Sequence, residues 1–262
     1  MSASLAIRSV HLRVADLARS VDFYRRGLGF AVLYQDSARA ELAANPAGPA
    51  LLTLTEDRTA RAPSPHAAGL FHAALLLPSR AALGHWITRA ADAGTEFDGF
   101  SDHGVSEAIY LTDVDGNGLE FYADREPAAW PVRDGGIAMF THPLDLQSVL
   151  HASAATPAPS APLAGAVWGH LHLRVTDPDR SVGYYHDLLG LDLIQRFGAD
   201  ARFVSRDGYH HHFGLNRWGG ISAPQPAQAL GLVDATVAAA NISAPTVARD
   251  ADGLTLNLVP LA

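Results

Sequence analysis

The fold can be inferred from one stretch that occurs twice. His11 to Leu33 reads HLRVADLARSVDFYRRGLGFAVL, and His172 to Ile194 reads HLRVTDPDRSVGYYHDLLGLDLI; they align without a gap at an offset of 161 residues, with 11 identities in 23 positions. Similarity at this level marks two copies of one structural unit. We therefore predict two modules, 1–150 and 166–262, joined by a linker, 151–165, that is rich in Ala, Pro and Ser.

Each copy opens with the pattern of a strand followed by a helix. Val10, Leu12 and Val14 alternate with polar residues, which is typical of a half-buried strand with His11 on the other face. The helix is predicted to start after the N-cap Asp16 and to end at Gly29 in a left-handed conformation. Its apolar residues recur with helical spacing at Leu17, Val21, Tyr24 and Leu28.

The rest of the first module is also predicted to consist of strands and a helix. We predict a strand over 70–77, a helix over 80–93 that ends at Gly94, and two strands, 109–111 and 119–122, joined by the turn DVDGNG. Strand, helix and further strands in this order predict an α+β fold.

Composition excludes several classes of function. The chain has 262 residues, 48% of them hydrophobic, a formal net charge of −8 and no run of 18 apolar residues. The stretch MSASLAIRSVHLRV lacks a basic region followed by an apolar run, so we expect no secretory leader. We expect a cytoplasmic protein that binds neither nucleic acid nor membrane. We also expect it to be a monomer or a homodimer. With no Cys and 13 His, any metal would be held by imidazole and carboxylate groups.

Strand periodicity predicts which polar side chains share a face. If helices cover the aliphatic face of the sheet, then His11, His72, Tyr110 and Glu120 project from the opposite, concave face. Two imidazoles and one carboxylate on separate strands are the components of a facial triad, which holds a divalent metal and leaves coordination positions open. Alternatively, each is simply a polar residue on a solvated strand face.

These motifs resemble a known family. HLRV, the helix after it, and the closing DGNGLEFY are similar to the vicinal oxygen chelate superfamily, which includes glyoxalases, bleomycin-resistance proteins and extradiol dioxygenases. The stretch His103 to Glu120, HGVSEAIYLTDVDGNGLE, looks like the extradiol signature. The resemblance implies tandem modules of βαβββ units, whose curved mixed sheets form concave clefts.

The resemblance also implies a site in the first module. It makes His11, His72 and Glu120 ligands of Fe(II) or Mn(II), and it makes His103 and Tyr110 the groups that exchange protons with the substrate. The implied reaction opens the ring of a catechol-like aromatic diol with O₂. Two alternatives stay open: a glyoxalase-like metal-dependent lyase or isomerase, and a binding protein that sequesters an aromatic drug.

The second module departs from this pattern. Thr255 is expected where Glu120 stands in the first module, so we expect no metal carboxylate there. A group of histidines, His170, His172, His210, His211 and His212, is predicted to form hydrogen bonds across the module interface, with a second metal site or a pocket wall as the alternative. Strand alternation would turn His211 away from its two neighbours. The family's additional acid/base His has no clear match.

Overall fold

The computed structural model describes residues 4–261 and has a mixed α+β architecture around one large curved sheet. The main strands of the first half are β1 (Leu5–Val14), β2 (Ala31–Gln35), β3 (Arg39–Ala43), β4 (Leu52–Glu56), β5 (Gly69–Leu76), β6 (Gly99–Asp102), β7 (Ser106–Thr112) and β8 (Gly118–Asp124). Those of the second half are β12 (Val167–Arg174), β13 (Asp192–Phe197), β14 (Ala201–Ser205), β15 (Phe213–Asn216), β16 (Gly231–Ala239), β17 (Thr246–Arg249) and β18 (Thr255–Pro260).

Helices follow the first strand of three units. They are α1 (Leu17–Asp22), which continues as the π-helix η1 (Phe23–Leu28), α2 (Arg80–Asp92) and α4 (Pro178–Leu189). Each of these three units has the order βαβββ, as expected for the family fold. The fourth unit is reduced to β16, β17 and β18, with a turn in place of the helix.

The remaining elements lie between the two halves. The short strands are β9 (Val132–Arg133), β10 (Gly136–Ile137) and β11 (His142–Pro143); the 3-10 helix η2 (Pro127–Ala129) precedes them and α3 (Leu146–Ala154) follows. No helix within residues 4–261 has the length and apolar character needed to cross a membrane.

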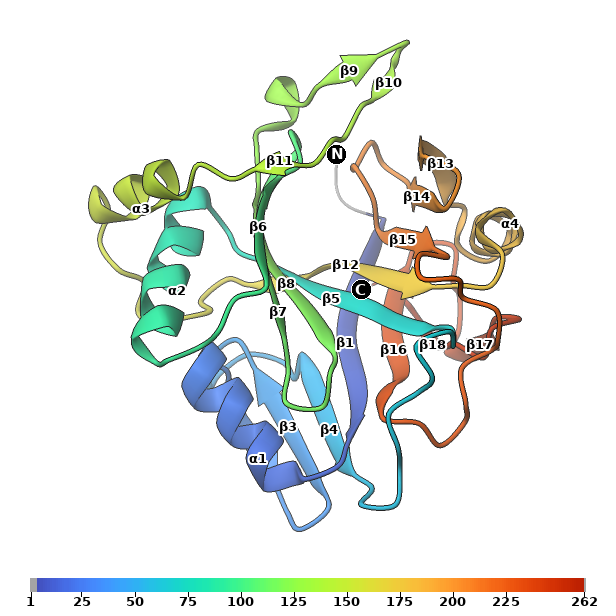
Figure 1. Cartoon of the computed structure of the whole chain (residues 1–262), viewed down its shortest axis with the longest axis horizontal. Coiled ribbons are helices and arrows are strands. Elements are labelled where there is room, and N and C mark those ends of the chain that lie inside the picture. The colour runs from blue at the N-terminus through green and yellow to red at the C-terminus, as the bar shows by residue number, and fades with distance from the viewer. Residues whose placement is uncertain (1–3, 262) are drawn as a thin grey trace.

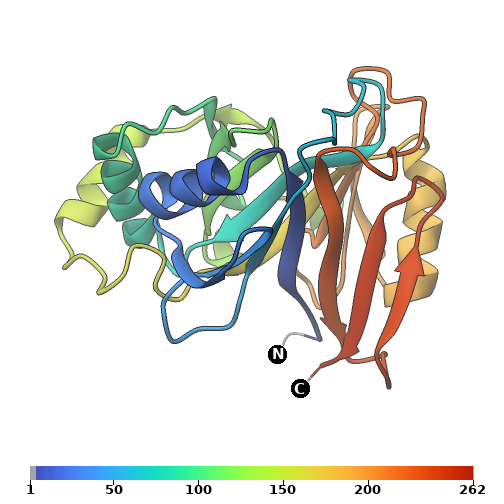
Figure 2. The same ribbon diagram turned by 90° about the horizontal axis from the view of Figure 1, so that it is seen from below.

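Strands pair across the two sequence halves. β5 pairs antiparallel with β12, and β1 pairs antiparallel with β16. In Figure 1, β5 and β12 run side by side at the centre, and Figure 2 shows β1 beside the last strands of the chain. This pairing creates two curved regions: a first cup, built on β5, β7, β8, β12, β14 and β15, and a second cup, built on β1, β3, β4, β16, β17 and β18.

The helices cover the outer, aliphatic faces, as the strand periods predict. Trp86 of α2 stacks on Phe121 of β8 with ring centroids 3.8 Å apart, and its indole N–H donates to the Leu28 carbonyl. Tyr185 of α4 stacks similarly on Phe213 of β15. Because Phe121 packs outward, its neighbour Glu120 points into the first cup.

The first helix has the predicted ends but an irregular interior. The Asp16 side chain accepts from the Arg19 amide, and Gly29 has a φ of 94°, which is the left-handed stop that the sequence predicts. Between them, the second half is π-helical from Phe23 to Leu28. The spacing of apolar residues does not predict a change from α-helix to π-helix.

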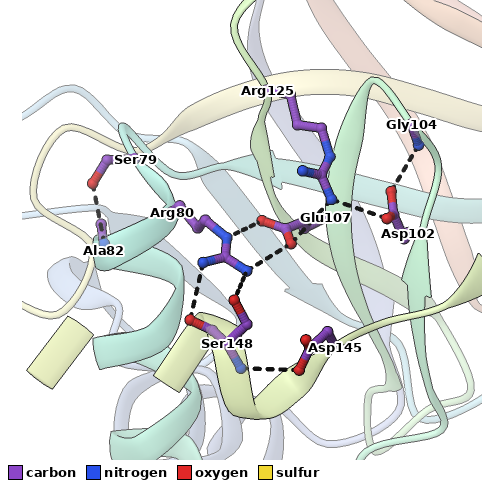
Figure 3. Close-up of polar contacts among 9 residues, drawn as sticks. All are labelled: Ser79, Arg80, Ala82, Asp102, Gly104, Glu107, Arg125, Asp145 and Ser148. Carbon is purple, nitrogen blue, oxygen red and sulfur yellow. Dashed lines mark hydrogen bonds and ion pairs between the residues drawn. The ribbon is translucent and has the colours of Figure 1, made fainter. Parts of the chain in front are cut away.

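A charge network around the buried carboxylate of Glu107 fixes the edge of the first cup (Figure 3). Arg80 of α2 donates to both carboxylate oxygens of Glu107 on β7 and to the Ser148 carbonyl of α3. Arg125, just after β8, donates to Glu107 and to Asp102. The Asp102 side chain in turn accepts from the Gly104 amide, so the network reaches the loop that carries the residue between them, His103.

Candidate metal centre

The first cup encloses a cavity of about 320 Å³. Its floor is polar and its walls are aromatic. The residues that line it are Phe71, His72, Ser101, His103, Tyr110, Glu120, Met139, Phe140, Thr141, His170, His172, Phe197, Phe203, His211 and Trp218.

Three side chains converge on the floor of this cavity. The Nε2 atom of His72 lies 2.9 Å from Oε2 of Glu120, and the Nε2 atom of His170 lies 3.1 Å from the same oxygen. Potential ligand atoms of the three residues lie within 4.8 Å of one another, and all three side chains are buried. They come from β5, β8 and β12, whose central strand is β5: Ala74 of β5 pairs with both Glu120 and His170.

This donor set fits a divalent metal ion. Although Nε2 of His72 is close to Glu120, it has no hydrogen-bond partner in a suitable geometry, and Nδ1 of buried His170 has none either. Buried nitrogens without a hydrogen-bond partner are rare, and they occur where another ligand is expected. Two imidazoles and one carboxylate are also the ligand set of open, facial metal sites.

The protonation states suit ligation. Burial raises the pKa of Glu120, but the adjacent imidazoles of His170 and His72 outweigh it and lower the pKa well below its usual range. Burial lowers the pKa of His170 despite the opposing effect of Glu120, so this imidazole keeps a nitrogen lone pair. His170 and Glu120 therefore offer the neutral and anionic donors that metals require.

His103 and Tyr110 form a hydrogen-bonded pair beside the cluster. Nδ1 of His103 lies 2.8 Å from the Phe140 carbonyl, and its Nε2 lies 2.7 Å from the Tyr110 hydroxyl. A carbonyl only accepts, so Nδ1–H is the donor there; in the neutral ring Nε2 then accepts from the Tyr110 O–H. Burial, followed by the charge of Glu120, raises the pKa of Tyr110 well above its usual range.

The structure does not bring His11 to this cavity. His11 faces the second cup, where Nδ1 lies 3.0 Å from Asp234 and Nε2 lies 2.9 Å from the Thr55 hydroxyl. The expected set of His11, His72 and Glu120 is thus replaced in the geometry by His72, Glu120 and His170. The reason is strand pairing: β1 contributes His11 to the cup that it forms with β16, whereas β5 lies between β8 and β12 and so brings Glu120 and His170 to His72.

One signal in the sequence could have identified His170. The 161-residue offset aligns His172 with His11, and it aligns His170 with Ser9. Only the second copy therefore carries a histidine two positions before the HLRV motif. His170 and His172 share a strand face, and both line the cavity.

The counterpart of Glu120 also differs from the expectation. Thr236 of β16 pairs with Asn257 of β18, just as Ala74 of β5 pairs with Glu120 of β8, so the register places Asn257 at the position we assigned to Thr255. The alignment was wrong by two residues. Asp250 accepts from the Asp252 and Leu254 amides as Asp113 accepts from the Asp115 and Asn117 amides, so the two turns match without a gap and place Asn257 at the position of Glu120.

The three consecutive histidines lie in a loop before β15 and not in a strand. The expectation that alternation would separate them is therefore wrong. His211 lines the cavity, with its ring 4.1 Å from that of His170 between centroids. Burial, then the neighbouring His170 and His210, lower its pKa well below the usual range. The cavity thus also contains the imidazole of His211, which is not part of the metal cluster.

Comparison with known proteins decides the family. The family model described as the Glyoxalase/Bleomycin resistance protein/Dioxygenase superfamily matches residues 6–121 and 168–252. The chain belongs to this superfamily. The two matched segments contain strands of both cups, and the chain between them holds the short elements from η2 to α3.

The chain is similar to a named enzyme and to proteins of solved structure. A catechol-2,3-dioxygenase of Bacillus subtilis (strain 168) is 40% identical over 226 residues, which cover 84% of this chain and 78% of the relative. The structure of a candidate dioxygenase from the same species superposes with a TM-score of 0.67 at 14% identity, over 98% of this chain and 86% of that one. Glyoxalase I of Zea mays gives a TM-score of 0.58 at 15% identity, over 98% and 92%. The last two likenesses establish the fold.

Proposed function

We propose that this protein is an extradiol-type dioxygenase that opens a catechol-like aromatic diol with O₂. The observation that carries the proposal is the convergence of His72, Glu120 and His170 at the floor of an aromatic cavity, beside the Tyr110 and His103 pair. The 40% identity to a catechol-2,3-dioxygenase supports the same reaction class.

The floor cluster would hold Fe(II), or alternatively Mn(II). Such an ion would supply the Lewis acidity and one-electron chemistry that a reaction between a diol and O₂ requires. Two neutral imidazoles and one carboxylate leave a divalent ion with a net charge of +1, which attracts an anionic diol. Outside the cluster, the residues of the chain bind the diol and move its protons.

Tyr110 and His103 act on one hydroxyl group of the substrate. Because its pKa is raised, Tyr110 stays protonated and donates to Nε2 of His103, which leaves the lone pairs of the phenolic oxygen to accept from the diol. When the diol passes this proton to the Tyr110 oxygen, the proton already on Tyr110 moves to Nε2 of His103, and the Tyr110 hydroxyl then donates to the new oxyanion.

His211 is our candidate for the acid/base histidine that the sequence did not reveal. It lines the cavity next to His170, and its lowered pKa keeps it neutral at physiological pH. A neutral imidazole can accept the proton of the second hydroxyl and return it to the ring-opened product.

The walls of the cavity suit a flat aromatic ring. Phe71, Phe203 and Trp218 surround His172, with Phe71 and Trp218 centroids 5.0 and 5.3 Å from the imidazole. A volume of about 320 Å³ lies at the small end of the range for ligand pockets. We therefore expect a substrate with one ring and short substituents.

The test is oxygen consumption by the metal-loaded protein. Protein reconstituted anaerobically with Fe(II) should consume one O₂ for each catechol, because both oxygen atoms enter the ring-opened product, which absorbs visible light. Neither oxygen uptake nor a coloured product across a panel of catechols would contradict the proposal. Mn(II) loading, run in parallel, identifies the preferred metal.

The same experiment separates the alternatives. A glyoxalase-like site would use a second carboxylate as base, but among the described residues that line the cavity Glu120 is the sole acid. Activity on a thiol adduct with Zn(II) or Ni(II) would support that reaction. A protein that binds aromatic compounds without retaining metal would instead be a binding protein.

A further inference from the structure

A row of three polar side chains leads away from the cavity behind His170. His211, which lines the cavity, places its Nδ1 2.7 Å from Nδ1 of His210. Nε2 of His210 lies 2.9 Å from Oδ1 of Asp124, at the end of β8. His210 is fully buried, whereas Asp124 is partly exposed, so the row connects the cavity wall to the edge of the sheet.

The order of donors and acceptors in this row follows from its outer end. A carboxylate only accepts hydrogen bonds, so His210 donates to Asp124 through Nε2–H. In a neutral ring the other nitrogen of His210 then carries a lone pair, and it accepts from Nδ1–H of His211. The remaining nitrogen of His211, Nε2, is left with its lone pair available.

Packing holds both rings in place. His211 lies between His170 and Phe203, with ring centroids 4.1 and 4.8 Å away. His210 is enclosed by Tyr209 and Trp130, at 4.0 and 5.3 Å. Since Nε2 of His210 faces Asp124 and its Nδ1 faces His211, the hydrogen bond to Asp124 selects a single tautomer for the whole row.

We propose that Asp124 and His210 are positioning residues that hold His211 with Nδ1 protonated and Nε2 directed to accept a hydrogen bond from the substrate hydroxyl. This inference rests on the proposed function, since it gives His211 a diol as its partner. It extends that function by assigning two residues outside the cavity wall to substrate orientation.

The direct test reads the tautomers without using activity. Two-bond ¹H–¹⁵N NMR spectra of the Zn(II)-loaded, diamagnetic protein should show His210 protonated at Nε2 and His211 protonated at Nδ1. His210→Gln and His211→Gln assign the two rings. A wild-type His211 protonated at Nε2, or a His210 protonated at Nδ1, would overturn the proposal.

The kinetic test uses Asp124→Asn, which keeps the size of the side chain but permits an amide to donate to His210. In a known Asp-His pair the same change fixes the wrong tautomer and severely lowers kcat. We expect kcat for catechol to fall at least about tenfold, KM to change less than about threefold, and bound metal to stay the same. Asp124→Glu, which retains a carboxylate, should recover most of kcat.

The control is Asp187→Asn, which changes an exposed carboxylate on α4 and should leave kcat and KM unchanged. An unaltered kcat in Asp124→Asn would overturn the positioning role. If the wild-type protein consumes no oxygen with any catechol but shows the expected tautomers, the proposed function fails and the assignment of the row is supported.

Discussion

The two cups of this molecule have the same strand register, but different polar residues occupy the matching positions. In the first cup, His172 pairs with His72, and Ala74 pairs with Glu120. In the second cup, the matching positions hold His11 opposite Asp234, and Thr236 opposite Asn257.

The hydrogen bonding of these positions differs most. Asp234 accepts from Asn257 at 2.8 Å and contacts His11 at 3.0 Å, while the other nitrogen of His11 contacts Thr55. The second cup is thus a closed network in which both His11 nitrogens have partners. In the first cup, ring nitrogens of His72, His170 and His172 are buried without hydrogen bonds.

The difference shows how one scaffold can make either a structural or a ligand-binding region. An unpaired buried polar group costs about 1–3 kcal/mol, so several in one cavity are a burden that a bound ligand can relieve. The second cup avoids this cost by pairing its polar groups internally. The following variants test whether the first cup binds ligands and the second cup has only a structural role.

The largest effect is expected from Glu120→Gln in the first cup. Loss of the anionic ligand should weaken Fe(II) binding by more than about 100-fold and abolish oxygen uptake. Elemental analysis and calorimetric titration measure the effect. The matched change in the second cup, Asn257→Ala, should leave metal content unaltered; loss of metal in this variant would show that the cups are not independent.

The next effect is a loss of stability in acid. Burial lowers the pKa of His212 from 6.5 to about 4, so between these values the unfolded chain binds a proton that the folded chain does not. Stability is therefore retained above pH 6.5 and should fall by about 3 kcal/mol as the pH drops to 4.

Burial lowers the pKa of His172 and His211 in the same direction. Urea unfolding of the metal-free protein at several pH values measures the slope. His212→Gln should flatten it, whereas His186→Gln, on the exposed face of α4, serves as the control. A stability that is independent of pH between 6.5 and 4 would contradict the neutral state of His212.

Removal of one hydroxyl from the first cup should affect turnover more than binding. Tyr110→Phe should lower kcat by about 100-fold with metal content unchanged, because the diol loses its hydrogen-bonding partner. Val247 occupies the matching position, since it pairs with Asn257 as Tyr110 pairs with Glu120. Val247→Ala should leave kcat unchanged, and a wild-type kcat in Tyr110→Phe would remove Tyr110 from the reaction.

The smallest effect is expected when the hydrogen-bond network of the second cup is broken. Asp234→Ala leaves His11 and Asn257 without their shared partner and should lower the free energy of unfolding by about 1–2 kcal/mol. Oxygen uptake should persist. Chemical denaturation and metal analysis of the same sample decide the result, and an unchanged midpoint would show that the network is not stabilising.

The sequence predicts local features of this fold well. Alternation along each strand placed His72, Tyr110 and Glu120 on the concave face, because side-chain direction in a strand is set by the residues beside it. The cap at Asp16 and the stop at Gly29 were predicted for the same reason.

Contacts between distant strands were harder to predict. Nothing near His11 or His170 indicates which strand pairs with β5, so the sequence grouped His11 with His72, whereas the structure places His170 beside His72. The residues 210–212 contain no turn signal that distinguishes a loop from a strand, and His211 was therefore placed on the wrong face. Pairing depends on the whole sheet, whereas periodicity is a property of each segment.

The pairing of β5 with β12 makes the candidate centre a joint product of both halves of the chain. Glu120 and His170 lie on either side of the segment 151–165, which joins the two halves. A chain severed in that segment would yield two fragments, each with an incomplete set of ligands. Neither fragment alone would contain the complete candidate centre, and only association of the two fragments would restore it.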